Sequence, residues 1–303
     1  MNDQEKRLRT NSFQPQRRGW NALKIFFRRH HLSRWVFFVI TLALVAFMLF
    51  PIFWMVRISL TPDSLLFTLP PKSIIKNINL NGYHGLFYRI KITYFYINSI
   101  VVATGTVITC VFCGTLAAYS FSRFKYRGRN TLMVVTLSAQ MFPWALMIIS
   151  LYILYIKTRL LDTRVGLILA HTTFALPLTI WIIKSYFDTI PRELEESAYI
   201  DGCSRMRTLL RIVLPLTIPG ILAAAIYVFI FSWNDFIFGL TLTTQNRTRT
   251  LAPGLSMTFI GEWEYHWVDM MSSSISITIP VVILFLFLQR YFIEGLTAGA
   301  LKD

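Results

Sequence analysis

Uncharged apolar runs long enough to cross a membrane restrict the fold of this chain more than any other feature. Residues 35–56 and 97–119 extend for 22 and 23 positions without a charged side chain. A helix needs about 20 apolar residues to cross a bilayer, where only helices and closed barrels satisfy their own backbone groups. These runs therefore predict transmembrane helices rather than the core of a soluble domain.

Six apolar segments, of which only 218–238 contains a charged residue (Asp235), predict an all-α polytopic membrane protein. They cover residues 35–56, 97–119, 131–156, 165–183, 218–238 and 270–289. We expect them to form one transmembrane domain over residues 35–292, between a basic N-terminal arm (1–34) and a short tail (293–303). The composition agrees, because 54% hydrophobic and 15% charged residues are atypical of a soluble globular domain.

The excess of basic residues predicts how these helices are oriented. The formal net charge is +15, which by itself would also suit a nucleic-acid-binding protein. If the N-terminus is cytoplasmic, 20 of the 30 Lys and Arg lie on that side. The segments on that side are 1–34, 120–130, 184–217 and 290–303. Because cytoplasmic loops favour Lys and Arg, we expect both termini in the cytoplasm and no nucleic-acid partner.

A polar segment, residues 188–215, interrupts the apolar spans and holds five of the fifteen acidic residues. Pro191 suits the first turn of a helix, and the carboxylate of Glu193 complements the positive end of the helix dipole. Gly202 can adopt the positive φ that ends a helix, and Ser204 can cap a second one. We therefore predict a helix of about three turns, a sharp turn and a second helix.

The first of these helices has little of its own to bury. Ile190, Leu194 and Ala198 recur every four residues and predict one narrow apolar ridge. A short amphipathic helix with so little apolar surface gains most of its stability from packing against something else. The segment is thus predicted either to cover the end of the bundle or to dock into another protein.

The pattern of this segment resembles a known motif. Glu196-Ser197-Ala198, three residues, Gly202, nine residues, Ile212, one residue and Leu214-Pro215 follow one another here. This spacing resembles the EAA loop of binding-protein-dependent ABC importer permeases, with Ser197 in place of the usual second alanine. In that family the loop is a coupling helix that docks in a cleft of a cytoplasmic ATPase subunit. We call residues 188–215 the coupling loop.

The resemblance implies a type I ABC importer permease fold and assigns ATPase coupling to one set of residues. These are Glu193, Glu196, Ser197, Ala198, Tyr199, Asp201, Gly202, Ile212, Leu214 and Pro215. The residue run 231–236 and the tail 290–302 resemble the carbohydrate, maltose-type branch of the family. The implied setting is the plasma (inner) membrane of a bacterium. The implied partners are a second permease subunit, two ATPase subunits, an extracytoplasmic solute-binding protein and a carbohydrate.

Four polar or aromatic residues near the spans are candidates for the substrate path. They are Gln140, Trp233, Asn234 and Asp235. Polar groups in a membrane usually face a cavity or a partner, and sugars bind through hydroxyl hydrogen bonds and aromatic stacking. An equally open alternative is that Asn234 and Asp235 fix the bundle, with Asp235 paired to a basic residue at the outer surface. For Gln140 and His171 a hydrogen bond between helices is the favoured interpretation.

Motifs for catalysis are missing from the sequence. It contains no GxxxxGK[ST] loop to hold phosphates and no HExxH or GxSxG motif. We therefore expect a transport subunit that is not an enzyme and binds no cofactor, with ATP–Mg on the partner ATPase subunits.

Two other functions stay open at this stage. One is an ion-coupled secondary transporter, which needs charged groups at mid-membrane, and the other is a non-transporting scaffold for a soluble ATPase. The sequence does not determine which sugar is carried, or whether the cargo is a sugar. It also leaves open whether the partner permease is a second copy or a different chain.

Overall fold

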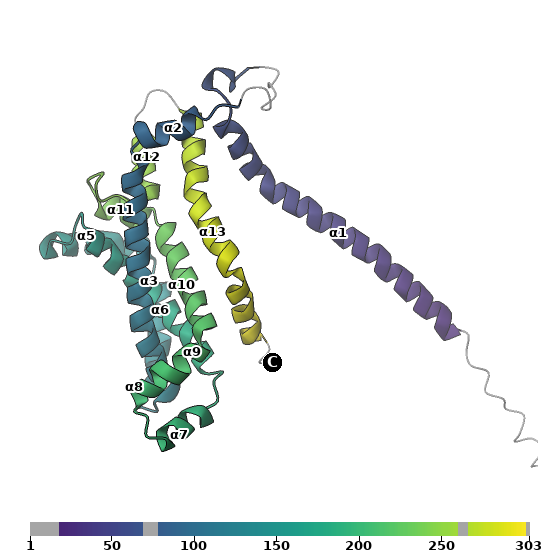
Figure 1. Cartoon of the computed structure of the whole chain (residues 1–303), viewed down its shortest axis with the longest axis vertical. Helices are drawn as coiled ribbons and strands as arrows, with labels where there is room; N and C mark the ends of the chain where they lie inside the picture. Colours follow the sequence, from purple (N-terminus) through teal and green to yellow (C-terminus); the bar gives the residue numbers. More distant parts are fainter. Residues whose placement is uncertain (1–17, 69–77, 260–265, 301–303) are drawn as a thin grey trace, which may run out of the picture. The chain divides into compact units, whose positions relative to one another are not determined.

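The computed structural model describes residues 18–68, 78–259 and 266–300, and all regular structure in these ranges is helical. The chain divides into a first unit that ends at Met55 and a second unit from Val56 onward. Figure 1 shows the helices with their labels.

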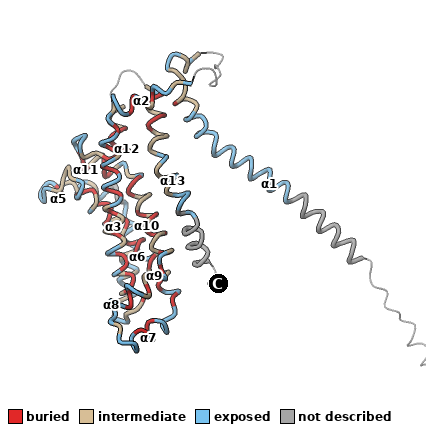
Figure 2. The backbone as a smooth tube through the Cα atoms, viewed as in Figure 1, coloured by how far each residue is buried: buried red, intermediate tan, exposed pale blue. Residues whose placement is uncertain are grey.

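Helix α1 (Arg18–Ser59) contains the expected first span and begins well inside the expected basic arm. Its stretch from Arg34 to Ser59 is long and apolar enough to cross a membrane. The side chains from 34 to 54 are exposed (Figure 2), and most of them are apolar. Such a surface is typically covered by lipid or by packing against other helices. The remainder of the arm, residues 1–17, lies outside the described residues.

The core of the second unit is built by three helices that pack on one another, α3 (Ile92–Arg123), α6 (Arg164–Phe187) and α10 (Ile218–Trp233). Small residues allow α3 and α6 to approach closely. A Cβ on Gly105 would lie 2.6 Å from the side chain of Ile168, and one on Gly114 would lie 2.9 Å from that of Thr179. A side chain at either glycine would therefore push these two membrane helices apart.

A fourth long helix, α13 (Trp267–Ala300), packs against α10 and against α2 (Asn81–Tyr88) (Figure 1). The expected sixth span was 270–289, followed by a separate tail. The helix continues to Ala300, so most of that tail extends the helix, and residues 301–303 lie outside the described part.

Two of the six expected spans are not single straight helices. The third divides at Pro143 into α4 (Arg129–Ser138), the 3-10 turn η3 (Ala139–Met141) and α5 (Trp144–Thr158), with a bend of 99°. Proline lacks the N–H that a continuous helix requires, which explains the position of the break.

The fifth expected span, 218–238, begins with α10 as predicted but ends at Trp233. A short helix, α11 (Ile237–Leu242), follows the break. Within the described residues, four helices are long and apolar enough to cross a membrane. The number rises to six if each of two bent pairs is one span: Arg129–Met141 with Leu146–Thr158, and Arg205–Leu216 with Ile218–Trp233.

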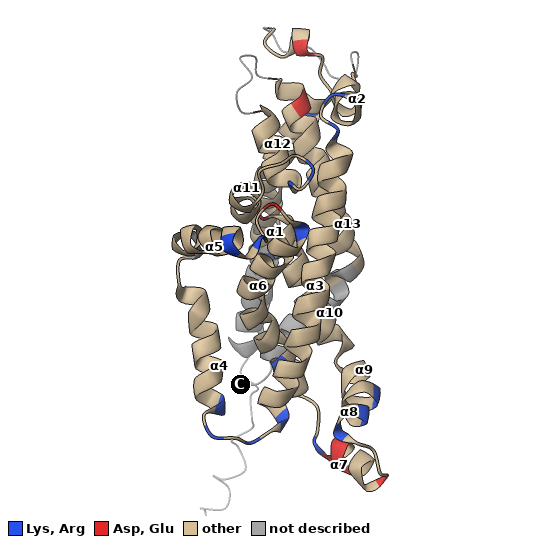
Figure 3. Cartoon of the chain, turned by 90° about the vertical axis from the view of Figure 1, so that its left-hand side faces the viewer, with Lys and Arg blue, Asp and Glu red and all other residues tan. Residues whose placement is uncertain are grey.

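The two ends of the second unit are built from different elements. At one end lies the coupling loop, with the acidic residues of α7 (Glu193–Ile200) beside the basic residues of α8 (Arg205–Thr208), and the basic loop between α3 and α4 is at the same end (Figure 3). At the opposite end lie α2, α11 and α12 (Leu251–Phe259) (Figure 1). This arrangement places the loop and the basic cluster at 123–129 on one side, as the charge pattern predicts.

Candidate functional site

The coupling loop has the helix–turn–helix form that its sequence predicts. Helix α7 ends before Gly202, whose φ of +81° lies in the left-handed region. The hydroxyl of Ser204 then accepts a hydrogen bond from the backbone N–H of Arg207 and caps α8. A π-helical turn, η4 (Leu209–Val213), and α9 (Leu214–Leu216) connect α8 to α10. Gly202 and Ser204 are thus confirmed as the helix stop and the new cap.

A buried ion pair attaches α7 to the end of α3. The carboxylate of Glu195 lies 2.5 Å from Nε of Arg123, and both side chains are less than one-tenth exposed. Tyr119 donates its hydroxyl to the same carboxylate at 3.0 Å, and Tyr199 donates at 3.4 Å. A second guanidinium nitrogen of Arg123 donates to the carbonyl of Ile190. The helix is therefore held to the bundle through charge as well as through apolar contact.

The predicted apolar ridge is wrong at one position. Ile190 and Ala198 are buried, but Leu194 is 45% exposed and Glu195 takes the inner face beside it. The reason is that Arg123 offers a buried positive charge to that face, and an unpaired charge there would be costly. Helix α7 also has eight residues, about two turns, rather than the expected three.

Most of the residues assigned to coupling lie on the surface. Glu193, Glu196, Ser197, Tyr199, Asp201, Gly202 and Pro215 are exposed, Ile212 and Leu214 are half-buried, and Ala198 is buried. Ile200, between them, is 87% exposed. Leu214 packs against the apolar cluster that includes Leu209 and Val213. The sequence reasoning missed Glu195, Leu209 and Val213, which join the loop to the bundle.

Asp188 ties the start of the loop to α3 and α6. Its carboxylate accepts hydrogen bonds from Ser122 at 2.6 Å and from Lys184 at 2.5 Å. Burial raises the pKa of this carboxyl group, but the bonds from Lys184 and Ser122 outweigh it, so that the pKa falls below its ordinary value. The carboxylate is thus held in its charged form where the loop begins.

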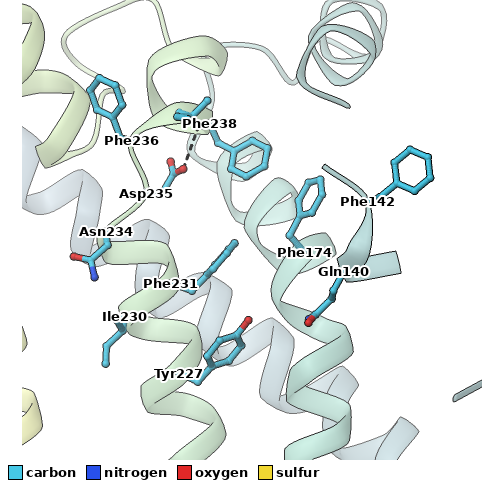
Figure 4. Close-up of a pocket in the computed structure, with 11 residues that line it drawn as sticks. Gln140, Phe142, Phe174, Tyr227, Ile230, Phe231, Asn234, Asp235, Phe236 and Phe238 are labelled. Carbon is cyan, nitrogen blue, oxygen red and sulfur yellow. Dashed lines mark hydrogen bonds between the residues drawn. The ribbon is translucent and has the colours of Figure 1, made fainter. Parts of the chain in front are cut away.

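A cavity of about 580 Å³ lies between α10, α6 and the break at Pro143. Its wall is mostly aromatic, and Figure 4 shows the side chains around it. The lining residues are Gln140, Phe142, Phe174, Tyr227, Ile230, Phe231, Asn234, Asp235, Phe236, Ile237 and Phe238. We call it the aromatic cavity. Its volume is within the range of small-molecule sites.

Three of the four substrate-path candidates meet at this cavity. Gln140, Asn234 and Asp235 line it, although Gln140 is distant from the other two in sequence. Trp233 does not: it is buried, stacks on Phe229 and donates its indole N–H to a backbone carbonyl of α13. Asn234 and Asp235 were expected inside the fifth helix, but they lie at the break after Trp233.

Asp235 stabilises the break itself. Its two oxygens accept the backbone N–H groups of Phe238 (3.1 Å; dashed in Figure 4) and Gly239 (2.8 Å), which caps α11. Its Oδ2 also lies 3.1 Å from Nε2 of the fully buried His171, in a contact without hydrogen-bond geometry. The other ring nitrogen of His171 lies 2.7 Å from the hydroxyl of Ser232. His171 therefore links α6 to α10 and α11, in line with the favoured interpretation.

Most of the aromatic wall was missed by the sequence reasoning. Tyr227, Ile230, Phe231 and Asn234 follow the helical spacing of three and four residues on one face of α10. That spacing is visible in the sequence and could have indicated a common face. Phe142 and Phe174 come from other helices and carry no such local signal.

No group of three or more His, Cys, Asp or Glu in residues 18–68, 78–259 and 266–300 is placed to hold a metal ion. The coupling loop thus presents a surface helix that is held to the bundle by its buried side. The aromatic cavity is large enough to hold a small molecule.

Comparisons with known proteins agree on one family. The family described as "Binding-protein-dependent transport system inner membrane component" matches residues 110–298. The trehalose/maltose transport system permease protein MalG of Thermococcus litoralis is 34% identical over 279 residues, covering 91% of this chain and 99% of that protein. The trehalose transport system permease protein SugB of Mycobacterium tuberculosis is 34% identical, covering 87% and 96%.

Among solved structures, a chain of a bacterial ABC transporter involved in the import of the acidic polysaccharide alginate has the same fold. Its TM-score is 0.77 at 20% identity, over 88% of this chain and 98% of that one.

Proposed function

The chain belongs to the inner membrane components of binding-protein-dependent transport systems, and from this premise we propose that it is a permease subunit of an ATP-driven carbohydrate importer. The carbohydrate cargo is inferred from relatives named for trehalose and maltose. One observation carries the mechanism: the coupling loop presents an exposed face while the buried pair of Glu195 and Arg123 fixes its inner face.

The exposed face of α7 suits docking into another protein. It offers Leu194, Tyr199 and Ile200 as exposed apolar groups, with Glu193 and Glu196 among them. Apolar side chains displayed beside charges are typical of a protein interface rather than of a free surface. We assign this face to the ATPase partner.

Movement of α7 would reach the membrane helices by two routes. The first is the Glu195–Arg123 pair, which connects α7 directly to the end of α3. The second is the apolar cluster around Leu209 and Val213, which connects the second half of the loop to α6 and α10. Since packed helices shift as rigid bodies, ATP-driven displacement of α7 would tilt the bundle around the aromatic cavity. Gly202 lies at the turn between the two routes.

The proposed assembly contains a second permease, two ATPase subunits and a solute-binding protein outside the membrane. Both termini, the basic loop 123–129 and the coupling loop would be cytoplasmic in a bacterial plasma membrane, with lipid around the apolar helices. The aromatic cavity, with Gln140, Asn234 and Asp235, is the proposed substrate path, and Trp233 no longer belongs to it.

The two rival functions lose support. An ion-coupled transporter needs a carboxylate that exchanges its ion, but both oxygens of Asp235 are engaged by the N-terminus of α11. A scaffold without transport activity does not agree with membership in a transport family.

Reconstitution and cross-linking test the proposal. Uptake into proteoliposomes should require ATP and the solute-binding protein, and an ion gradient should not replace ATP.

With Cys113 and Cys203 changed to Ser, Ile200→Cys should cross-link to the co-purifying ATPase. Asn130→Cys, an exposed position at the same end, serves as the control. Gradient-driven uptake without ATP, or ATPase binding without flux, would contradict the proposal.

A further inference from the structure

The aromatic cavity presents almost no charge to whatever enters it. Among its lining residues no Lys, Arg or His is found, and Asp235 is the one carboxylate. Both oxygens of Asp235 accept backbone N–H groups, and its side chain is 9% exposed. The charge is therefore compensated within the protein, and His171, its basic neighbour, is fully buried behind it.

The polar groups that remain on the wall are neutral. They are the amides of Gln140 and Asn234 and the hydroxyl of Tyr227. Gln140 comes from the η3 turn and Tyr227 from α10, and their polar ends face one another in Figure 4, while Asn234 follows the last residue of α10. Amides and hydroxyls both donate and accept hydrogen bonds, which suits a ligand covered with hydroxyl groups.

Two pairs of aromatic rings provide apolar surface beside these groups. The rings of Tyr227 and Phe231 have centroids 6.3 Å apart and an interplanar angle of 34°. Those of Phe174 and Phe238 are 5.0 Å apart at 31°. Neighbouring rings with similar tilt can cover the C–H face of a sugar ring, and aromatic side chains combine large area with defined geometry.

We propose that the aromatic cavity admits uncharged saccharides and discriminates against acidic ones such as uronates and sugar phosphates. An anionic group there would lose its water without gaining a positive partner, which is unfavourable. Neither family nor fold decides this point, since one relative is named for trehalose and maltose and a chain of the same fold belongs to an importer of acidic alginate. This inference rests on the proposed function, and it narrows the expected cargo from carbohydrates in general to uncharged saccharides.

Direct binding tests the inference without the selectivity of the solute-binding protein. The purified complex, free of nucleotide, is equilibrated by dialysis with labelled maltose, trehalose and cellobiose, and separately with a glucuronic-acid disaccharide. At least one neutral sugar should bind about tenfold or more tightly than the acidic one. Equal or tighter binding of the acidic sugar, or no binding of either class, would overturn the inference.

Matched variants locate the site. Tyr227→Ala should weaken neutral-sugar binding about three- to tenfold through loss of the ring, whereas Tyr227→Phe keeps the ring and should remain closer to wild type. Gln140→Lys adds a cation to the wall and should shift the preference toward the acidic disaccharide. Unchanged affinity in Tyr227→Ala together with unchanged preference in Gln140→Lys would place the sugar elsewhere.

ATP dependence of uptake, measured on the same preparation, reports on the proposed function independently of cargo charge.

Discussion

The coupling loop and the α10–α11 break each depend on one carboxylate, buried in Glu195 and half-buried in Asp235, but the two carboxylates act differently. Glu195 is paired with the guanidinium of Arg123, on another helix, and receives two tyrosine hydroxyls. Both oxygens of Asp235 accept backbone N–H groups of α11, the helix that follows it. Asp235 also contacts the ring of His171. The first arrangement joins two helices, and the second shapes one local break.

This difference suits the proposed roles of the two regions. An arginine holds its charge and can grip a carboxylate in a fixed geometry, so a force on α7 reaches α3. A helix cap such as Asp235 bonds only to the nearby backbone. It shapes the cavity wall locally and does not connect that wall to a distant helix. Substitutions at the two carboxylates should therefore differ in size and in kind.

The largest effect is expected for Glu195→Ala. Removing one partner of a buried ion pair leaves Arg123 uncompensated and costs about 3–5 kcal/mol. Helix α7 should lose its hydrogen-exchange protection, and sugar uptake should collapse. Glu195→Gln keeps the shape of the side chain and should retain part of the hydrogen-exchange protection and part of the uptake. Wild-type protection and uptake in Glu195→Ala would show that the pair does not hold the loop.

Gly202→Val should have the next largest effect. A β-branched residue at a φ of +81° is strained at a cost of about 1–3 kcal/mol, although the space around Gly202 is open. We expect normal insertion into the membrane with strongly reduced uptake and reduced cross-linking from position 200. Asn tolerates this conformation better, so Gly202→Asn is the control. Similar losses in both variants would contradict an explanation based on backbone strain.

Asp235→Ala should be milder than Glu195→Ala. Loss of a helix cap costs about 1 kcal/mol, and α11 should exchange its amide protons faster while α7 is unaffected. Asp235→Asn keeps an acceptor oxygen and should lie between Asp235→Ala and wild type. If Asp235→Ala also removed hydrogen-exchange protection from α7, Asp235 would not act only on the break between α10 and α11, and the contrast with Glu195 would be wrong.

The smallest effect concerns Asp162, which joins the loop before α6 to the segment after α11. Its carboxylate accepts hydrogen bonds from Thr248 and from the backbone of Thr244 and Gln245. Burial raises the pKa of this carboxyl group, but these bonds and Arg247 outweigh it, and the pKa lies below its ordinary value.

A carboxyl group with a lowered folded-state pKa contributes stability that is complete above its unfolded pKa and is lost as the pH falls through the folded one. Loop 243–250 should therefore become less protected from proteolysis as the pH falls below about 4. Asp162→Asn should remove this pH dependence, and an unchanged profile in that variant would assign it to another group.

The sequence alone determined the features that depend on neighbouring residues. Long uncharged runs predicted membrane helices, and Gly202 and Ser204 predicted a stop and a cap, because each depends on local backbone chemistry. The spacing from Glu196 to Pro215 was enough to indicate the family.

Only the tertiary structure decided which side chains of these segments face inward. Glu193, Glu195 and Glu196 are alike as residues, and Glu195 is buried because Arg123, 72 positions away, points a positive charge at it. In the same way, Trp233 and Asn234 are adjacent, yet one is packed against α13 and the other lines the cavity. Such choices depend on contacts between distant parts of the chain, and no local pattern contains them.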